Sequence, residues 1–220
     1  MKEIPYVHLF DLAAGALLVT SALILWRREL SGIIRVLALQ GVALAGLVAV
    51  LAVREGSAEL GTVAAGVLVL RAGVLPYLLL RALDRTGHGR RETRPLVNVA
   101  SSLVTAAALT LLSYAVSRPL VELAPSAATR AIPVGLTVAL IGLFVLVTRR
   151  RALSQLVGFL LLDNGITAIG FLTMASVGLM VEVGVSLDVL LAALVLRILT
   201  ERMAETFGDT DLDELRELHD

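Results

Sequence analysis

The sequence predicts an all-α fold, a polytopic membrane helix bundle of about seven transmembrane helices. Its 220 residues are 57% hydrophobic and only 17% charged, and the mean hydropathy is +0.88. A soluble protein of this composition would lack the polar side chains needed to cover its core. The apolar residues also fall in runs of about twenty, the length at which a helix crosses a hydrocarbon layer about 30 Å thick.

Each apolar run is bounded by charged residues, proline or glycine, which are typical of the ends of a membrane span. In chain order, the expected spans are Tyr6–Trp26, Ile33–Val53, Leu60–Leu83, Leu96–Val116, Arg130–Thr148, Ala152–Ala175 and Gly178–Thr200. The first run lacks a convincing small-residue cleavage site. It is therefore expected to be a retained helix and not a signal peptide.

Arginine-rich connections alternate with arginine-poor ones along the chain. Arg27 and Arg28 follow the first span, four arginines lie within 84–95, and the run 149–151 before the sixth span is entirely arginine. By the positive-inside rule, this pattern predicts that the N-terminus is outside and the C-terminus is in the cytoplasm. The arginines themselves are expected to orient the chain and to contact lipid headgroups.

The residue types exclude several kinds of chemistry on this chain. There is no cysteine, which rules out Fe–S clusters, thiolate metal sites, disulfides and cysteine nucleophiles. His8, His88 and His219 are too scattered in sequence to suggest a ligand set. The formal net charge is zero, so nothing indicates a nucleic-acid partner. We expect no catalytic residue, no metal and no cofactor on this chain.

Of the ionisable residues inside the expected spans, four in particular need a reason. Arg71 lies at the centre of the third span, Asp163 at the centre of the sixth and Asp188 at the centre of the seventh. Glu182 precedes Asp188 by about 9 Å along the same helix. A charged side chain at the centre of a bilayer costs about 2.5–3.5 kcal/mol on insertion scales. These four residues are therefore candidates for a proton relay.

Three polar residues are expected to support the relay. Asn164 follows the acid of the sixth span, and Thr167 lies one turn further along the same face. Gln40, in the second span, is expected to form an interhelical hydrogen bond. A structural interpretation competes with the relay, in which Arg71 and one acid form a buried pair that only fixes helix packing. Asp11, near the outer end of the first span, is expected to be a helix-end or headgroup residue.

A weak internal repeat suggests how the chain is divided. Arg27 and Arg28 followed by the run 40–46 resemble Arg150 and Arg151 followed by the run 164–170. The two copies would be three-helix units in the same orientation, joined by the fourth span. The expected segments are 1–95 with spans one to three, 96–129 with the connecting span and an outer loop, 130–200 with spans five to seven, and 201–220 with an acidic cytoplasmic tail.

Two membrane motifs and the tail carry a resemblance to a known family. They are GFLLLDNG at 158–165, VEVGVSLD at 181–188 and DTDL at 209–212. With the chain length, they resemble the E family of hydrogenase-4 membrane subunits. The last three spans are similar to the small K subunit of bacterial complex I and to the C subunit of multisubunit cation/proton antiporters.

The resemblance also relates the intramembrane acids of this sequence to the membrane glutamates of the K subunit. Asp188 stands at the place of the second membrane glutamate of the K subunit. Asp163 lies one turn beyond the place of the first, which is Leu160 here. The resemblance implies a non-catalytic, multi-pass subunit of an energy-converting oxidoreductase complex in a prokaryotic inner membrane, where carboxylates pass protons and partner chains hold the redox centres.

The implied partners are antiporter-like and anchor subunits in the membrane, and cytoplasmic redox subunits that face the basic connections and the acidic tail. Two other functions stay open. The chain could serve a multisubunit cation/proton antiporter, or it could be a structural membrane scaffold without a transport role.

Overall fold

The computed structural model describes residues 3–86, 98–123 and 126–173, and every element in these ranges is helical. The elements are α1 (Glu3–Trp26), α2 (Leu30–Glu55), α3 (Ala58–Val67), the π-helix η1 (Leu68–Val74), α4 (Leu75–Thr86), α5 (Val99–Leu123), α6 (Ala127–Thr148) and α7 (Ala152–Thr173). The expected seventh span, Gly178–Thr200, lies outside the described residues, and so do Glu182 and Asp188.

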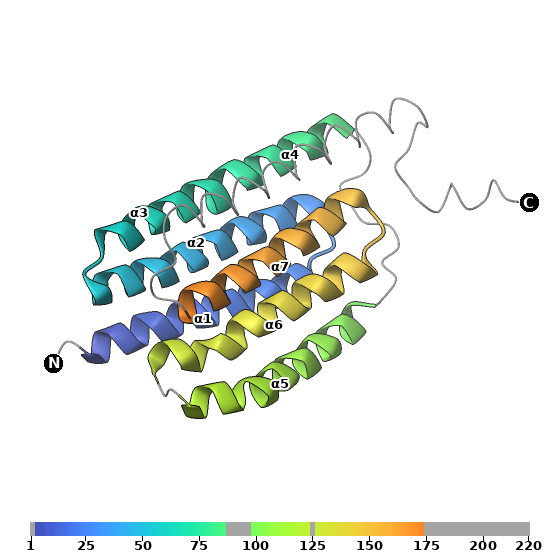
Figure 1. Ribbon diagram of the computed structural model, residues 1–220. Coiled ribbons are helices and arrows are strands. Elements are labelled where there is room, and N and C mark those ends of the chain that lie inside the picture. Colours follow the sequence, from blue (N-terminus) through green and yellow to red (C-terminus); the bar gives the residue numbers. More distant parts are fainter. Residues whose placement is uncertain (1–2, 87–97, 124–125, 174–220) are drawn as a thin grey trace, which may run out of the picture.

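Six helices in the described ranges are long and apolar enough to cross a membrane. They are Tyr6–Trp26, Leu30–Glu55, Ala58–Asp84, Val99–Leu123, Ala128–Thr148 and Ala152–Thr173. The third of them is one continuous rod made of α3, η1 and α4 (Figure 1). The described part of the chain is therefore an all-helical, multi-pass membrane bundle.

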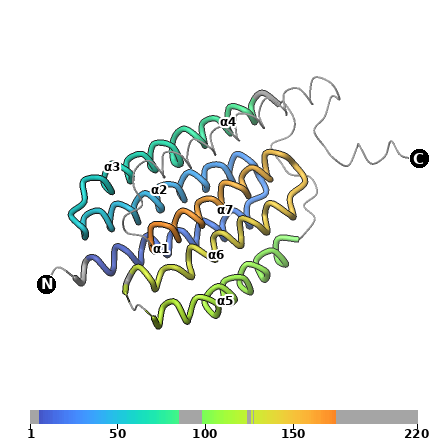
Figure 2. The backbone as a smooth tube through the Cα atoms, in the orientation of Figure 1, coloured from blue at the N-terminus to red at the C-terminus, as the bar shows by residue number. Residues whose placement is uncertain are grey.

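The helices run alternately up and down, as the tube in Figure 2 shows. The α1–α2 and α6–α7 connections, which carry Arg27, Arg28 and the arginines of 149–151, lie at one end of the bundle, and the α2–α3 turn lies at the other (Figure 1). The two basic connections that the structure describes therefore lie at the same end of the bundle. The side of the membrane that this end faces stays a prediction.

The tight turn between α2 and α3 is fixed by two capping residues. Gly56 ends α2 with a positive φ of 62°, and its N–H donates to the Ala52 carbonyl. A glycine adopts this left-handed conformation without steric cost. Ser57 then caps α3 by accepting from the N–H of Leu60. The rod of α3, η1 and α4 consequently folds back along α2.

The fourth span extends further than its hydropathy predicts. The expected end was Val116, but α5 continues to Leu123 with Pro119 inside it. Arg118 Nε lies 2.9 Å from Glu122 Oε1, one turn further on, and both side chains are exposed. This pair satisfies two charges on the helix surface, so the helix continues into a polar stretch.

Burial is concentrated in the middle of the bundle. Helix α2 contacts α1, α3, η1, α4 and α7, and α6 contacts α1, α5 and α7. In α6 and α7, 61% of the most apolar window is buried, against only 17% in α5. The buried residues of α5, Ser102, Ala106, Ser113 and Ser117, are all small, whereas Leu111 and Leu123 are exposed. This inverted pattern fits a helix whose large side chains face lipid.

Helices α6 and α7 approach so closely that backbone meets backbone. The contacts along the seam are Gly135 with Ile169, Ala139 with Gly165, Gly142 with Leu162, and Leu146 with Gly158. The steps of four, three and four residues along each helix are those of an antiparallel heptad seam. Glycine on alternating sides of the seam provides the room, since small residues allow close helix packing in membranes.

Gly165→Ala is expected to destabilise the protein by about 1–3 kcal/mol, the usual cost of overpacking. A Cβ at position 165 would lie 2.7 Å from both the Ala139 Cα and the Gly135 carbonyl oxygen, which belong to rigid backbone. Gly170→Ala is the matched control on the same helix, because no described residue of another element lies within 4 Å of its added Cβ. Denaturation midpoints in detergent micelles measure both, and equal midpoints would contradict the tight seam.

Candidate functional site

Arg71 stands in the π-helical segment η1, in the middle of the span Ala58–Asp84. The N–H of Leu75 donates to the carbonyl of Leu70, five residues back. Pro76 follows, and a proline has no N–H to donate four residues back. The wider turn thus lies just before the position where the regular α-helical ladder is interrupted. π-Helical turns occur frequently at functional sites.

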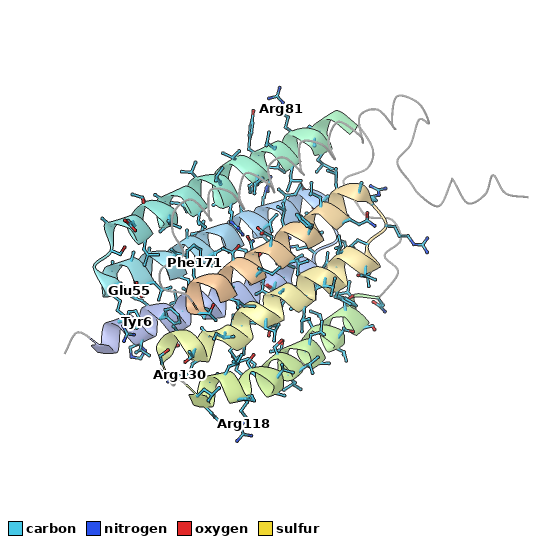
Figure 3. All side chains as sticks on the ribbon, in the orientation of Figure 1. Tyr6, Glu55, Arg81, Arg118, Arg130 and Phe171 are labelled. Carbon is cyan, nitrogen blue, oxygen red and sulfur yellow. The ribbon has the colours of Figure 1, made fainter. Side chains whose placement is uncertain are left out.

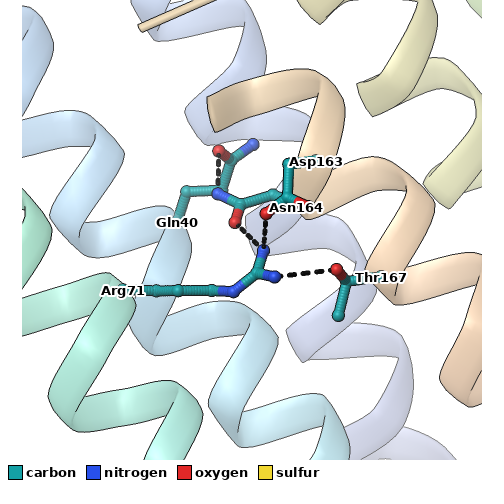
Figure 4. Close-up of polar contacts among 5 residues, drawn as sticks. All are labelled: Gln40, Arg71, Asp163, Asn164 and Thr167. Carbon is teal, nitrogen blue, oxygen red and sulfur yellow. Dashed lines mark hydrogen bonds and ion pairs between the residues drawn. The ribbon is translucent and has the colours of Figure 1, made fainter. Parts of the chain in front are cut away.

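Helix α2 passes η1 closely at this point because Gly41 has no side chain. A Cβ at position 41 would lie 2.7 Å from the carbonyl carbon of Arg71 and 2.8 Å from the backbone nitrogen of Ala72. The contact fixes the spacing between α2 and the π-helical turn. It also places Gln40, the residue before the glycine, in the same layer of the bundle as Arg71 (Figure 4).

The Arg71 guanidinium reaches from η1 to α7 and meets three side chains there (Figure 4). Its Nη1 lies 2.8 Å from Asp163 Oδ2 and donates to Asn164 Oδ1 at 2.5 Å. Its Nη2 donates to Thr167 Oγ1 at 2.8 Å. The side chain of Arg71 is 3% exposed and that of Asp163 is 13% exposed. The ion pair offsets part of the cost of burying each charge.

A chain of amides extends this contact to α2 and α1. Asn164 Nδ2 donates to Gln40 Oε1 at 3.0 Å, and Gln40 Nε2 donates to Ser21 Oγ at 2.9 Å. Ser21 Oγ donates to the Leu17 carbonyl of its own helix at 2.7 Å. Gln40 and Ser21 are 0% exposed and Asn164 is 4% exposed. A single polar network therefore links α1, α2, η1 and α7 inside the bundle.

The structure brings together five residues that the sequence singled out: Gln40, Arg71, Asp163, Asn164 and Thr167 (Figure 4). Gln40 makes the interhelical hydrogen bonds expected of it. The relay roles of Asp163 and Arg71 stay a proposal, as do those of Glu182 and Asp188.

Other charged residues of the described helices stay away from this network. Asp11 and His8 are exposed on α1. Arg81, on the same rod as Arg71, is exposed and points away from the bundle, as does Arg118 on α5 (Figure 3). In the parts of the chain that the structure describes, no group of three or more His, Cys, Asp or Glu side chains could hold a metal ion.

Ser21 is the member of the network that sequence reasoning missed. Its only signal is that Thr20 and Ser21 interrupt the apolar run of α1. A hydroxyl in a membrane helix usually bonds to a carbonyl of its own helix, as Thr20 does here with Ala16. Such a residue carries little information until its partner on another helix is known.

Among the residues that the structure describes, the network contains one group that can exchange a proton. The guanidinium of Arg71 stays charged, and amides and hydroxyls do not titrate under ordinary conditions. The Asp163 carboxyl can take up or release a proton beside that fixed positive charge. Within the described ranges, the arrangement is a proton-binding site in the middle of the span Ala152–Thr173, with a permanent counter-charge from another span.

Comparison with known proteins finds relatives along the whole chain. The sequence is 50% identical to the uncharacterized protein Rv0085 of Mycobacterium tuberculosis over 220 residues, which is 100% of both chains. It is 24% identical to hydrogenase-4 component E of Escherichia coli K12, and of Shigella flexneri, over 205 residues, 93% of this chain and 94% of each relative. No family model and no solved structure matches the chain. The likeness to component E agrees with the resemblance that the motifs carry, at the level of distant relatives.

Proposed function

The chain belongs to the family of the mycobacterial protein Rv0085, and from its distant likeness to hydrogenase-4 component E we propose a role in proton translocation. In this proposal it is a membrane subunit of an energy-converting oxidoreductase complex of the hydrogenase-4 type. Other membrane subunits surround it, and cytoplasmic subunits hold the redox centres. The chain itself has no cysteine to bind such a centre.

The observation that carries the proposal is the buried ion pair of Arg71 with Asp163. Both residues lie near the centres of their spans, where a charge costs the most. Helix packing alone does not require this cost, because apolar side chains of similar volume stabilise a buried position at least as well. An acid kept at mid-membrane, with its counter-charge, is what a stepwise proton path needs.

Each residue then has a role in the proposed path. Asp163 carries the proton and Arg71 is its fixed counter-charge. Asp188 and Glu182 are further carriers at two depths of the seventh span. Asn164, Thr167 and Gln40 hold the counter-charge in place.

Asp163→Asn tests the proposal, because it removes the proton site and keeps the side-chain shape. With the chromosomal gene replaced, we expect hydrogen-driven acidification of inverted membrane vesicles to fall at least about tenfold, as when a general acid–base group is removed. Asp188→Asn is expected to do the same. Asp11→Asn, on the exposed face of α1, is the control and should leave the rate unchanged. Wild-type acidification in both the Asp163→Asn and Asp188→Asn variants, with normal assembly, would leave only the scaffold function.

A further inference from the structure

The hydrogen bonds of the amide chain can point in one direction only. Arg71 can only donate, and the Leu17 carbonyl at the far end can only accept. Asn164 must therefore turn its oxygen to Arg71 and its NH₂ to Gln40, and Gln40 must turn its NH₂ to Ser21. A flip of Asn164 would place NH₂ against the guanidinium and oxygen against oxygen. The order of donors is fixed by the two ends.

The hydrogen-bonded amides of Asn164 and Gln40 cannot carry protons, because amides neither gain nor lose them under ordinary conditions. They do determine what Arg71 contacts. The guanidinium has two neutral acceptors on α7, Asn164 Oδ1 and Thr167 Oγ1, in addition to the Asp163 carboxylate. The neutral acceptors remain when Asp163 takes up a proton and the ion pair is lost.

We propose that Gln40 and Ser21 are positioning residues that hold Arg71 at the proton site whichever protonation state Asp163 adopts. Gln40 fixes the Asn164 amide, and Ser21 fixes the Gln40 amide, so the oxygen of Asn164 always faces the guanidinium. Arg71 stays beside the neutral carboxyl and stabilises the carboxylate as soon as the proton leaves. The inference rests on the proposed proton translocation and assigns to α1 and α2 a part in it.

In the ranges that the structure describes, the charges around Asp163 are few enough for this effect to be measured. Among the helices packed against α7, α6 has no charged residue within 131–148 and α2 has none within 36–53. In the described ranges, η1 contributes Arg71. A change in the position of that one arginine should therefore appear directly in the pH dependence of proton release.

Gln40→Met removes the amide and keeps the length of the side chain. Without the Gln40 amide, the Asn164 oxygen is no longer held toward Arg71, although Thr167 Oγ1 remains as an acceptor. Arg71 is then less firmly held beside the neutral carboxyl, and proton release needs a higher pH. We expect the pH optimum of hydrogen-driven translocation in inverted vesicles to move to higher pH by about one unit. Ser21→Ala should give a smaller shift in the same direction. The control is Ser113→Ala, because Ser113 is equally buried and bonds to the Leu109 carbonyl of its own helix.

An unshifted pH profile in Gln40→Met, with wild-type assembly, would overturn the inference. If Gln40→Met does not assemble, Ser21→Ala decides in the same way: a shift relative to Ser113→Ala supports the inference and an unshifted profile overturns it. The Asp163→Asn variant separates this outcome from the proposed function. Suppose that Asp163→Asn loses translocation but the Gln40→Met and Ser21→Ala profiles are unshifted. This result would contradict the positioning role and leave the proposed proton translocation in place.

Discussion

Arg71→Met is expected to destabilise the protein by about 3–5 kcal/mol, the cost of removing one partner of a buried ion pair. The methionine fills most of the space but leaves the Asp163 carboxylate without its cation and the Asn164 oxygen without its donor. Reversible denaturation in mixed micelles, followed by circular dichroism, measures the change.

Arg118→Met is the matched control for that experiment. Arg118 also pairs with an acid at 2.9 Å, but the two side chains are 79% and 66% exposed and lie one turn apart on α5. Pairs of this kind contribute about 0.3–0.5 kcal/mol. Similar losses for the two variants would show that the burial of Arg71 in the structure is wrong.

Much of the candidate site could be predicted from the sequence because charges inside apolar runs are rare. Arg71 and Asp163 stand out against their spans, and Asn164 and Thr167 follow from the helical period. The contact between the third and sixth spans could not be predicted, since hydropathy gives the length of a helix and not its neighbours. The close contact of the second and third spans is equally invisible in hydropathy, since it depends on Gly41, whose missing side chain lets α2 and η1 meet.

The π-helical turn η1 was not predicted from the sequence, because it depends on local backbone features. Hydropathy in Leu60–Leu83 does not distinguish an α-helical turn from the π-helical turn of η1, because the residues around Arg71 are apolar in either case. Pro76 was the only local signal of an irregularity. Gln40 and Asn164, which occupy matching positions in the weak repeat, are hydrogen-bonded to each other, and the repeat itself stays a prediction.

The double variant Arg71→Met with Asp163→Val separates a structural role of the ion pair from a transport role. Removing both charges leaves no unpaired carboxylate, and apolar side chains replace a buried pair at little or no cost. Thr167 can turn its hydroxyl to a carbonyl of its own helix, so the main remaining loss is the donor to Asn164 Oδ1. We expect stability to return to within about 1–3 kcal/mol of the unsubstituted protein, the cost of one unsatisfied acceptor.

Proton translocation is expected to stay at the background level in the same double variant, although the complex assembles. If the pair only fixed helix packing, restored packing would restore the activity, and acidification of inverted vesicles would recover together with stability. Recovery of both would therefore contradict the relay. Recovery of stability alone assigns the charges to transport, since no packing defect would then remain to explain the loss.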